Sequence, residues 1–193
     1  GVIPAYFSQG ALKDLYLDIY ERSNPRNDEL IGAGAIASMA ALIGQRFCIK
    51  AGPFDKRANS QVIMLGKSGS GKDAPQGYYQ KLVHKIYGYE CDVTTYHSPT
   101  TVQSRLSKTG YCFEKRDEAG DLLNAINAGA RSSTALAQIG SMIKELKTSA
   151  NKFYKGFTES ALTEGRTYVT KQPFYVSLSG ATPGQYKDAT GNS

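Results

Sequence analysis

The sequence predicts an α/β protein of three layers, in which a mainly parallel sheet lies between two layers of helices. Two observations carry this prediction. Segments with strand and helix patterns alternate along most of the chain, as they do in proteins built from β-α-β units. Residues 62–65 form a short, entirely apolar run, which is typical of a parallel strand that is covered on both faces.

The first 45 residues are expected to be helical. Apolar residues at helical spacing predict a helix over residues 12–20, and the turn-rich residues 23–28 end it. Asn27 or Asp28 can cap a second helix. Its apolar run, residues 31–43, is shorter than the roughly 20 residues that span a bilayer, so we expect a buried helix and no membrane segment.

The remaining elements follow in the order that a parallel sheet requires. Strands are predicted at 62–65, 93–96, 111–117 and 173–179, and helices at 73–87, 99–106, 118–126 and 132–150. In such sheets ligands bind beyond the carboxyl ends of the strands.

The length of the chain predicts one domain. A chain of 193 residues with 40% hydrophobic content can bury one sizeable core. We expect a single domain over residues 1–193, with N-terminal helices over about 11–45 and a core over about 46–190, which contains the glycine-rich segment described below. The ends carry no obvious terminal element, so we expect the chain to be part of a longer protein.

The net charge and the cysteines bear on the binding partners of the protein and on the redox state of its compartment. A net charge of +6 raises the local concentration of polyanions without specifying one, and a merely soluble basic protein explains it as well. Cys48, Cys91 and Cys112 are odd in number and have apolar or aromatic neighbours, which favours buried, reduced thiols inside a cell. His84 and His97 have no partner at metal-ligand spacing.

The strongest motif is the segment Gly66-Lys67-Ser68-Gly69-Ser70-Gly71-Lys72, between a predicted strand and a predicted helix. A phosphate loop needs glycines that turn backbone amides inward, a lysine for the β and γ phosphates, and a helix N-terminus that faces the anion. The segment therefore predicts binding of a nucleoside triphosphate, with an ordinary glycine turn as the alternative. Asp73 stands where a magnesium-binding serine or threonine is usual, and its carboxylate can also ligate magnesium.

A pair of acids, Asp117 and Glu118, ends the predicted strand at 111–117. Hydrolysis of a triphosphate needs one carboxylate to hold magnesium and another to orient or deprotonate water. Acids at a helix N-terminus are also favoured by the helix dipole, which is the structural alternative. Glu114 is a further candidate carboxylate, and its strand is unusually polar for a buried one.

Two further polar segments are candidates for contacts with a ligand. Ser177, Ser179 and Thr182 end the last predicted strand and can sense the γ-phosphate or orient water, although such residues are common at strand ends. A second segment mixes the cations and aromatic rings that single-stranded nucleic acid uses, and we treat it as a candidate binding loop. Buried aromatics and solvated lysines are the alternative. Its members are Lys152, Phe153, Tyr154, Lys155, Phe157, Arg166, Tyr168 and Lys171.

Over roughly residues 30–187 these segments resemble the ATPase domain of phage, plasmid and bacterial primase-helicase proteins. The resemblance lies in Gln45-Arg46-Phe47, in the loop followed by Asp73-Ala74-Pro75, in Asp117-Glu118-Ala119-Gly120 and in Ser179-Gly180-Ala181-Thr182-Pro183. The phosphate loop alone is common to many families, whereas the combination is more particular.

The resemblance implies a P-loop NTPase fold with a RecA-like helicase sheet, and ATP and Mg²⁺ as cofactors. It implies that Lys72 contacts the triphosphate, Asp117 holds magnesium, Glu118 activates water, and Ser179 or Thr182 is the polar sensor. It also implies that an acid at position 73 is tolerated. Ring-like homo-oligomers that move along nucleic acid, expected to be single-stranded DNA, would then work in the cytoplasm of a bacterial or phage-infected cell. In such rings a neighbouring subunit commonly supplies a cation, for which Arg131, Arg166 and Lys171 are candidates.

We therefore expect an ATP-hydrolysing helicase-like motor domain that acts on DNA in the replication of a mobile element. A P-loop phosphotransferase is one alternative, although no arginine-rich lid is evident. A module that binds nucleotide only to stabilise an assembly is another, with Asp73 marking a degenerate site. A DNA-packaging or loader ATPase would use the same catalytic parts.

Overall fold

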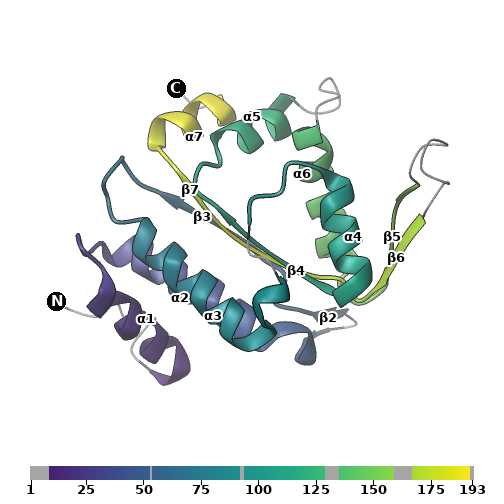
Figure 1. Ribbon diagram of the computed structural model, residues 1–193, viewed down its shortest axis with the longest axis horizontal. Coiled ribbons are helices and arrows are strands. Elements are labelled where there is room, and N and C mark those ends of the chain that lie inside the picture. The colour runs from purple at the N-terminus through teal and green to yellow at the C-terminus, as the bar shows by residue number, and fades with distance from the viewer. Residues whose placement is uncertain (1–8, 53, 92–93, 129–134, 159–166, 192–193) are drawn as a thin grey trace.

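The protein is an α/β protein built around a three-stranded parallel sheet (Figure 1). The computed structural model describes residues 9–52, 54–91, 94–128, 135–158 and 167–191. The strand order is β3 (Ser60–Leu65), β7 (Phe174–Ala181) and β4 (Tyr111–Arg116). The predicted strands at 62–65, 111–117 and 173–179 are confirmed. The expectation that the run 62–65 is covered on both faces is wrong, because β3 is an edge strand and its Ile63 and Leu65 side chains are exposed. All three strands run in the same direction, so their carboxyl ends, at Leu65, Ala181 and Arg116, lie at the same end of the sheet.

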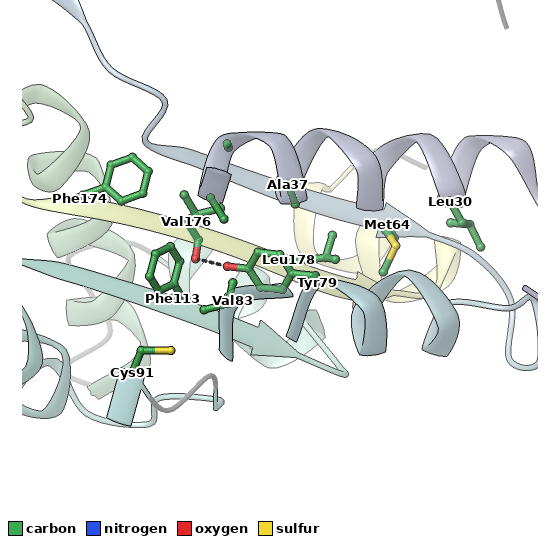
Figure 2. Close-up of a cluster of buried hydrophobic side chains, with 12 residues drawn as sticks. Leu30, Ala37, Met64, Tyr79, Val83, Cys91, Phe113, Phe174, Val176 and Leu178 are labelled. Carbon is green, nitrogen blue, oxygen red and sulfur yellow. Dashed lines mark hydrogen bonds between the residues drawn. The ribbon is translucent and has the colours of Figure 1, made fainter. Parts of the chain in front are cut away.

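One face of the sheet is covered by α2 (Asp28–Ile43) and α3 (Asp73–Tyr87), and α1 (Gly10–Arg22) packs against both helices. Figure 2 shows the core on this face, where Tyr79 and Val83 of α3 meet Val176 and Leu178 of β7. The buried hydroxyl of Tyr79 donates to the carbonyl of Val176 at 3.0 Å. This bond fixes α3 along the central strand without leaving a polar atom unpaired.

The other face is covered by α4 (Pro99–Thr109), α5 (Gly120–Ala128) and α6 (Ala135–Thr148). Leu106, Cys112, Met142 and Tyr175 belong to its core. Helices thus lie on both faces, which is why β7, the central strand, is buried along its whole length.

Two antiparallel ribbons and a terminal helix complete the described chain. β1 (Ile49–Ala51) pairs with β2 (Phe54–Lys56), and β5 (Phe153–Thr158) pairs with β6 (Thr167–Lys171). α7 (Pro183–Thr190) follows β7. Single 3₁₀ turns, η2 (Gly44–Arg46) and η3 (Tyr89–Cys91), follow α2 and α3. The nucleic-acid candidate segment, which we expected to be a loop, is the β5–β6 hairpin.

The helix predicted from the apolar run 31–43 is confirmed as α2, which is buried along most of its length. Asn27 caps it, because its side chain accepts a hydrogen bond from the backbone amide of Leu30 at 3.2 Å. In the described part of the chain, no helix has the length and apolarity needed to cross a bilayer.

The strand expected at 93–96 is wrong for the residues that can be judged. Val93 lies outside the described residues, and residues 94–98 have no regular secondary structure. The segment still runs beside β4, but side chains make the contacts that a ladder would make. Thr95 donates its hydroxyl to Lys115 O at 2.9 Å, and the amide of Tyr96 donates to the Glu114 carboxylate at 3.3 Å.

The expectation of three buried thiols is wrong for one of them. Cys91 and Cys112 are buried, whereas Cys48 lies exposed between η2 and β1. None of the three forms a disulfide within the described structure. Burial raises the pKa of the Cys112 thiol from 9.0 to about 12, so this sulfur stays protonated at neutral pH.

We expect Ellman's reagent to titrate one thiol of the native protein rapidly and the other two only after unfolding, because the thiolate is the reactive species. The fast thiol should disappear in Cys48→Ser and persist in Cys112→Ser. Rapid reaction of two or three thiols in the native protein would contradict the burial of Cys91 and Cys112.

Candidate nucleotide-binding site

The glycine-rich loop, residues 66–72, connects the carboxyl end of β3 to the first residue of α3. The Gly66 amide donates to Ala181 O at 3.0 Å, so the loop begins bound to the end of the central strand. The Ser70 amide donates to Lys67 O at 3.2 Å and closes a turn within the loop. The 15-residue helix α3 begins at once, and its free backbone amides favour an anion at this end.

The Lys72 side chain folds back across this loop. Its Nζ donates to Gly66 O at 2.5 Å and to Lys67 O at 3.2 Å. The ammonium group therefore lies inside the turn of the loop, where a phosphate held by the loop amides would meet it.

Three glycines give the loop its shape. Gly69 has a φ of 72° and Gly71 a φ of 92°, a region that other residues rarely adopt. A Cβ on Gly71 would lie 2.6 Å from Pro25 O, in the segment between α1 and α2. A Cβ on Gly66 would lie 2.3 Å from Ser70 Oγ, a buried atom that has no hydrogen-bond partner within the described structure. Only glycine fits these close approaches, and the loop retains an unpaired polar atom.

Gly180 is the point at which the three parts of the site meet. A Cβ at this position would lie 2.8 Å from Asp117 O, 3.2 Å from Lys72 Cδ and 3.4 Å from Gln76 Nε2. The carbonyl of Gly180 accepts a hydrogen bond from the Ala119 amide at 2.7 Å. The loop lysine and the chain that follows β4 therefore both lie close to Gly180, and the chain after β4 is hydrogen-bonded to it.

The acidic pair follows β4 at this meeting point. Asp117 and Glu118 are both exposed, and Asp117 pairs with Lys115 at 3.3 Å. An ion pair at the surface is weak, so Asp117 can exchange this partner for a cation at little cost. Ala119 and Gly120 behind them are buried, which holds the backbone in place while the two carboxylates face solvent.

The polar residues of the last strand divide between two roles. Ser179 is buried one residue before Gly180, and by strand alternation its side chain lies on the same sheet face as Tyr175 and Ser177. Thr182 caps α7: its hydroxyl accepts from the Gln185 amide at 3.2 Å, and its own amide donates to Gln185 Oε1 at 2.9 Å. Thr182 directly follows Ala181, whose carbonyl binds the first residue of the loop, and it already has a structural task. Ser179 pairs with Ile63 in β3, three residues before the loop.

Asp73 is exposed in the first turn of α3, where the helix dipole favours a carboxylate. It also lines a cleft between α1 and α3 together with Asp18, Arg22 and Tyr78. No group of three or more His, Cys, Asp or Glu side chains among the described residues forms a metal site. Magnesium bound mainly by phosphate oxygens needs only one or two carboxylates, and Asp117 or Asp73 can supply them.

Sequence reasoning did not identify Gln76 as part of the site. Its buried side chain donates to Arg116 O at 3.0 Å and so joins the helix after the loop to the end of the acidic strand. A polar residue one turn before Tyr79 and Val83, on the buried face of α3, is the signal that marks it. Pro25, which lies against Gly71, carried no such signal.

The remaining motif residues lie elsewhere. Gln45 is at the opposite end of the sheet, where its side-chain amide donates to Gly110 O at 2.5 Å and to Gln172 O at 2.9 Å. It therefore has a structural task. Of the candidate cations from a neighbouring subunit, Lys171 is exposed on β6, and Arg131 and Arg166 lie outside the described residues.

Comparison of the chain with protein-family models, with curated proteins and with solved structures finds no match.

Proposed function

We propose that the protein is a P-loop NTPase with a RecA-like helicase core, which binds and hydrolyses ATP as a motor on DNA. The observation that supports the proposal best is the close approach at Gly180, where the side chain of Lys72 and the backbone carbonyl of Asp117 both lie beside the end of β7. A phosphate cradle and a pair of carboxylates at neighbouring strand ends are the parts that triphosphate hydrolysis needs.

The proposed roles follow from this placement. The loop amides of Gly66–Lys72 and the α3 N-terminus bind the β and γ phosphates. Lys72 leaves its contact with Gly66 O to pair with the phosphates, and Asp117 leaves Lys115 to hold the magnesium ion. Magnesium, when bound, neutralises charge on the phosphate oxygens. Glu118 accepts a proton from the attacking water, and Ser179 or Thr182 contacts the γ-phosphate.

The use of this activity is proposed from the resemblance to primase-helicase ATPase domains. The motor would act on single-stranded DNA during replication of a phage, plasmid or other mobile element, as a homo-oligomeric ring in the cytoplasm. The net charge of +6 supports a polyanionic partner.

The proposal predicts magnesium-dependent ATP turnover that rises with single-stranded DNA and is lost in Lys72→Ala. Glu118→Gln should lower turnover by about 10²- to 10⁴-fold, the usual contribution of a general base, while ATP binding persists. A coupled phosphate-release assay measures turnover, and fluorescence of a labelled ATP analogue measures binding.

Two exposed residues outside the loop and the acidic pair provide matched controls. Lys85→Ala in α3 and Glu145→Gln in α6 remove the same kinds of charge and should keep wild-type turnover. Equal turnover in the wild type and in Lys72→Ala would reject the proposed site.

A module that binds ATP without hydrolysing it is the second candidate, and Asp73 is the observation that favours it. A carboxylate in place of the usual serine or threonine adds negative charge beside the triphosphate. ATP that raises the melting temperature but is not hydrolysed, with or without DNA, would support this alternative. Turnover that increases in Asp73→Ser would show that the carboxylate only slows a motor.

A further inference from the structure

The β5–β6 hairpin has two faces of different character. Its inner face packs on α4: Tyr154 and Thr170 are buried, and Gln103 donates to the Tyr154 hydroxyl at 3.4 Å. A Cβ on Gly156 would lie 2.8 Å from the Gln103 side chain. These contacts fix the hairpin to the body of the protein (Figure 1).

The outer face consists of Phe153, Lys155, Val169 and Lys171, all of them exposed. Phe153 lies opposite Lys171, and Lys155 lies opposite Val169. Side chains at directly opposed positions are about 5 Å apart, so each apolar side chain has an ammonium group beside it. Phe153 has 68% of its surface exposed and Val169 has 53%. A buried structural role therefore does not explain these two residues.

We propose that this outer face binds single-stranded nucleic acid, with the Phe153 ring stacking on a base and Lys155 and Lys171 contacting the flanking phosphates. The binding itself does not depend on the proposed motor function. Only the expectation that this binding raises ATP turnover rests on that proposed function. Lys152, which precedes β5, is exposed as well, and the described residues of both strands include no acid.

The charge and the exposed ring together favour this ligand. A polyanion matches a face with two lysines and no described carboxylate, and the exposed ring of Phe153 offers a stacking platform to an unpaired base. In a duplex the bases already stack on one another, so the ring would add little affinity. The side chains of Phe157 and Tyr168, and all of Arg166, lie outside the described residues, and the proposal does not use them.

The hairpin and the glycine loop lie at opposite ends of β7. β6 leads through Gln172 and Pro173 into the first residue of β7, and Gly180 is near the other end. Eight strand residues span about 26 Å at roughly 3.3 Å per residue. Changes on the outer face should therefore leave ATP binding unchanged, and β7 provides a direct connection between the two sites.

The test measures binding of a fluorescein-labelled 20-nucleotide oligo(dT) by anisotropy at several salt concentrations. Phe153→Ala should weaken binding roughly 5- to 150-fold, the range for the loss of one base–aromatic stack, and Phe153→Tyr should retain it. Lys155→Ala combined with Lys171→Ala should reduce the slope of log K against log salt by about 1.4, at roughly 0.7 for each phosphate contact.

Matched controls come from the last turn of α3 and from η3, on the side of the other sheet face. Tyr89→Ala and Lys85→Ala remove an exposed ring and an exposed charge there and should bind the oligonucleotide like the wild type. The melting temperature of every variant shows whether it is folded. An oligo(U) probe tests RNA, and a matched duplex should bind more weakly and without dependence on Phe153.

Three outcomes would overturn the inference: no binding of oligo(dT) by the wild type, equal binding by the hairpin variants and the controls, or Phe153-independent binding of duplex and single strand alike. Lys72→Ala should keep the oligonucleotide contact. Loss of turnover alone would thus count against the motor and leave the outer face supported.

Discussion

Glu114→Ala is expected to lower the free energy of unfolding by about 3–5 kcal/mol, the usual effect of breaking a buried ion pair. Arg116 donates to Glu114 Oε1 at 2.5 Å, and only 4% and 1% of these two side chains are exposed. The Tyr175 hydroxyl donates to the other carboxylate oxygen, and the Tyr96 amide donates to the first. Removing the carboxylate leaves a buried guanidinium without its counter-charge and a buried hydroxyl without its acceptor.

Urea unfolding of the wild type and the variants measures this effect. The matched control is the double variant Glu114→Leu with Arg116→Met, which removes both charges and keeps the apolar volume. It should be less destabilised than Glu114→Ala, because desolvation of both ions is avoided, although the Tyr175 hydroxyl still loses its acceptor. A loss below about 1 kcal/mol in Glu114→Ala would show that the pair does not hold β4 in place.

The same pair shows why the burial of β4 is difficult to predict from the sequence. Glu114 and Arg116 made the strand at 111–117 look too polar for a buried position. The structure solves this by placing both on one face of β4, two residues apart, where they neutralise each other. Tyr96 and Tyr175, which complete the network, come from segments 18 and 61 residues away. No local pattern reports such partners, whereas the apolar run of β3 and the alternation in β7 are local and were predicted correctly.

In the candidate site too, local features could be predicted from the sequence, whereas contacts between distant segments could not. The loop and the helix after it could be predicted because β3, the glycines, Lys72 and α3 are consecutive in the chain. The contacts of Gly71 with Pro25 and of Gln76 with the end of β4 join segments more than 39 residues apart. They depend on how α2 and α3 pack on the sheet, which residue spacing does not determine.

The β5–β6 hairpin could be identified from the sequence only as a mixture of cations and aromatics. The antiparallel register separates that mixture, because it turns Tyr154 inward against α4 and leaves Phe153 on the outer face. Adjacent aromatic residues thus have different tasks, which composition alone cannot distinguish.

Gly180→Ala is expected to lower ATP turnover by about 100-fold, the usual effect of a displacement near 1 Å between reacting groups. The new Cβ would lie 2.8 Å from Asp117 O, so the end of β4 must move. The movement separates Asp117 and Glu118 from Lys72. The free energy of unfolding should fall by about 1–3 kcal/mol, as overpacking usually causes.

Gly184→Ala is the matched control, because the nearest atom to its new Cβ is Thr182 Oγ1 at 4.0 Å. Turnover, ATP binding and urea unfolding are measured for both variants below the onset of unfolding, which separates a displaced site from an unfolded protein. Full turnover in Gly180→Ala would mean that the glycine loop and the acidic pair do not act together. ATP binding that survives while turnover falls would instead support separate roles for the two parts of the site. The loop would hold the phosphates, and the acidic pair that follows β4 would hold magnesium and act on the attacking water. That division requires the contact at Gly180 to be kept close, and a residue without a side chain is the simplest way to keep it.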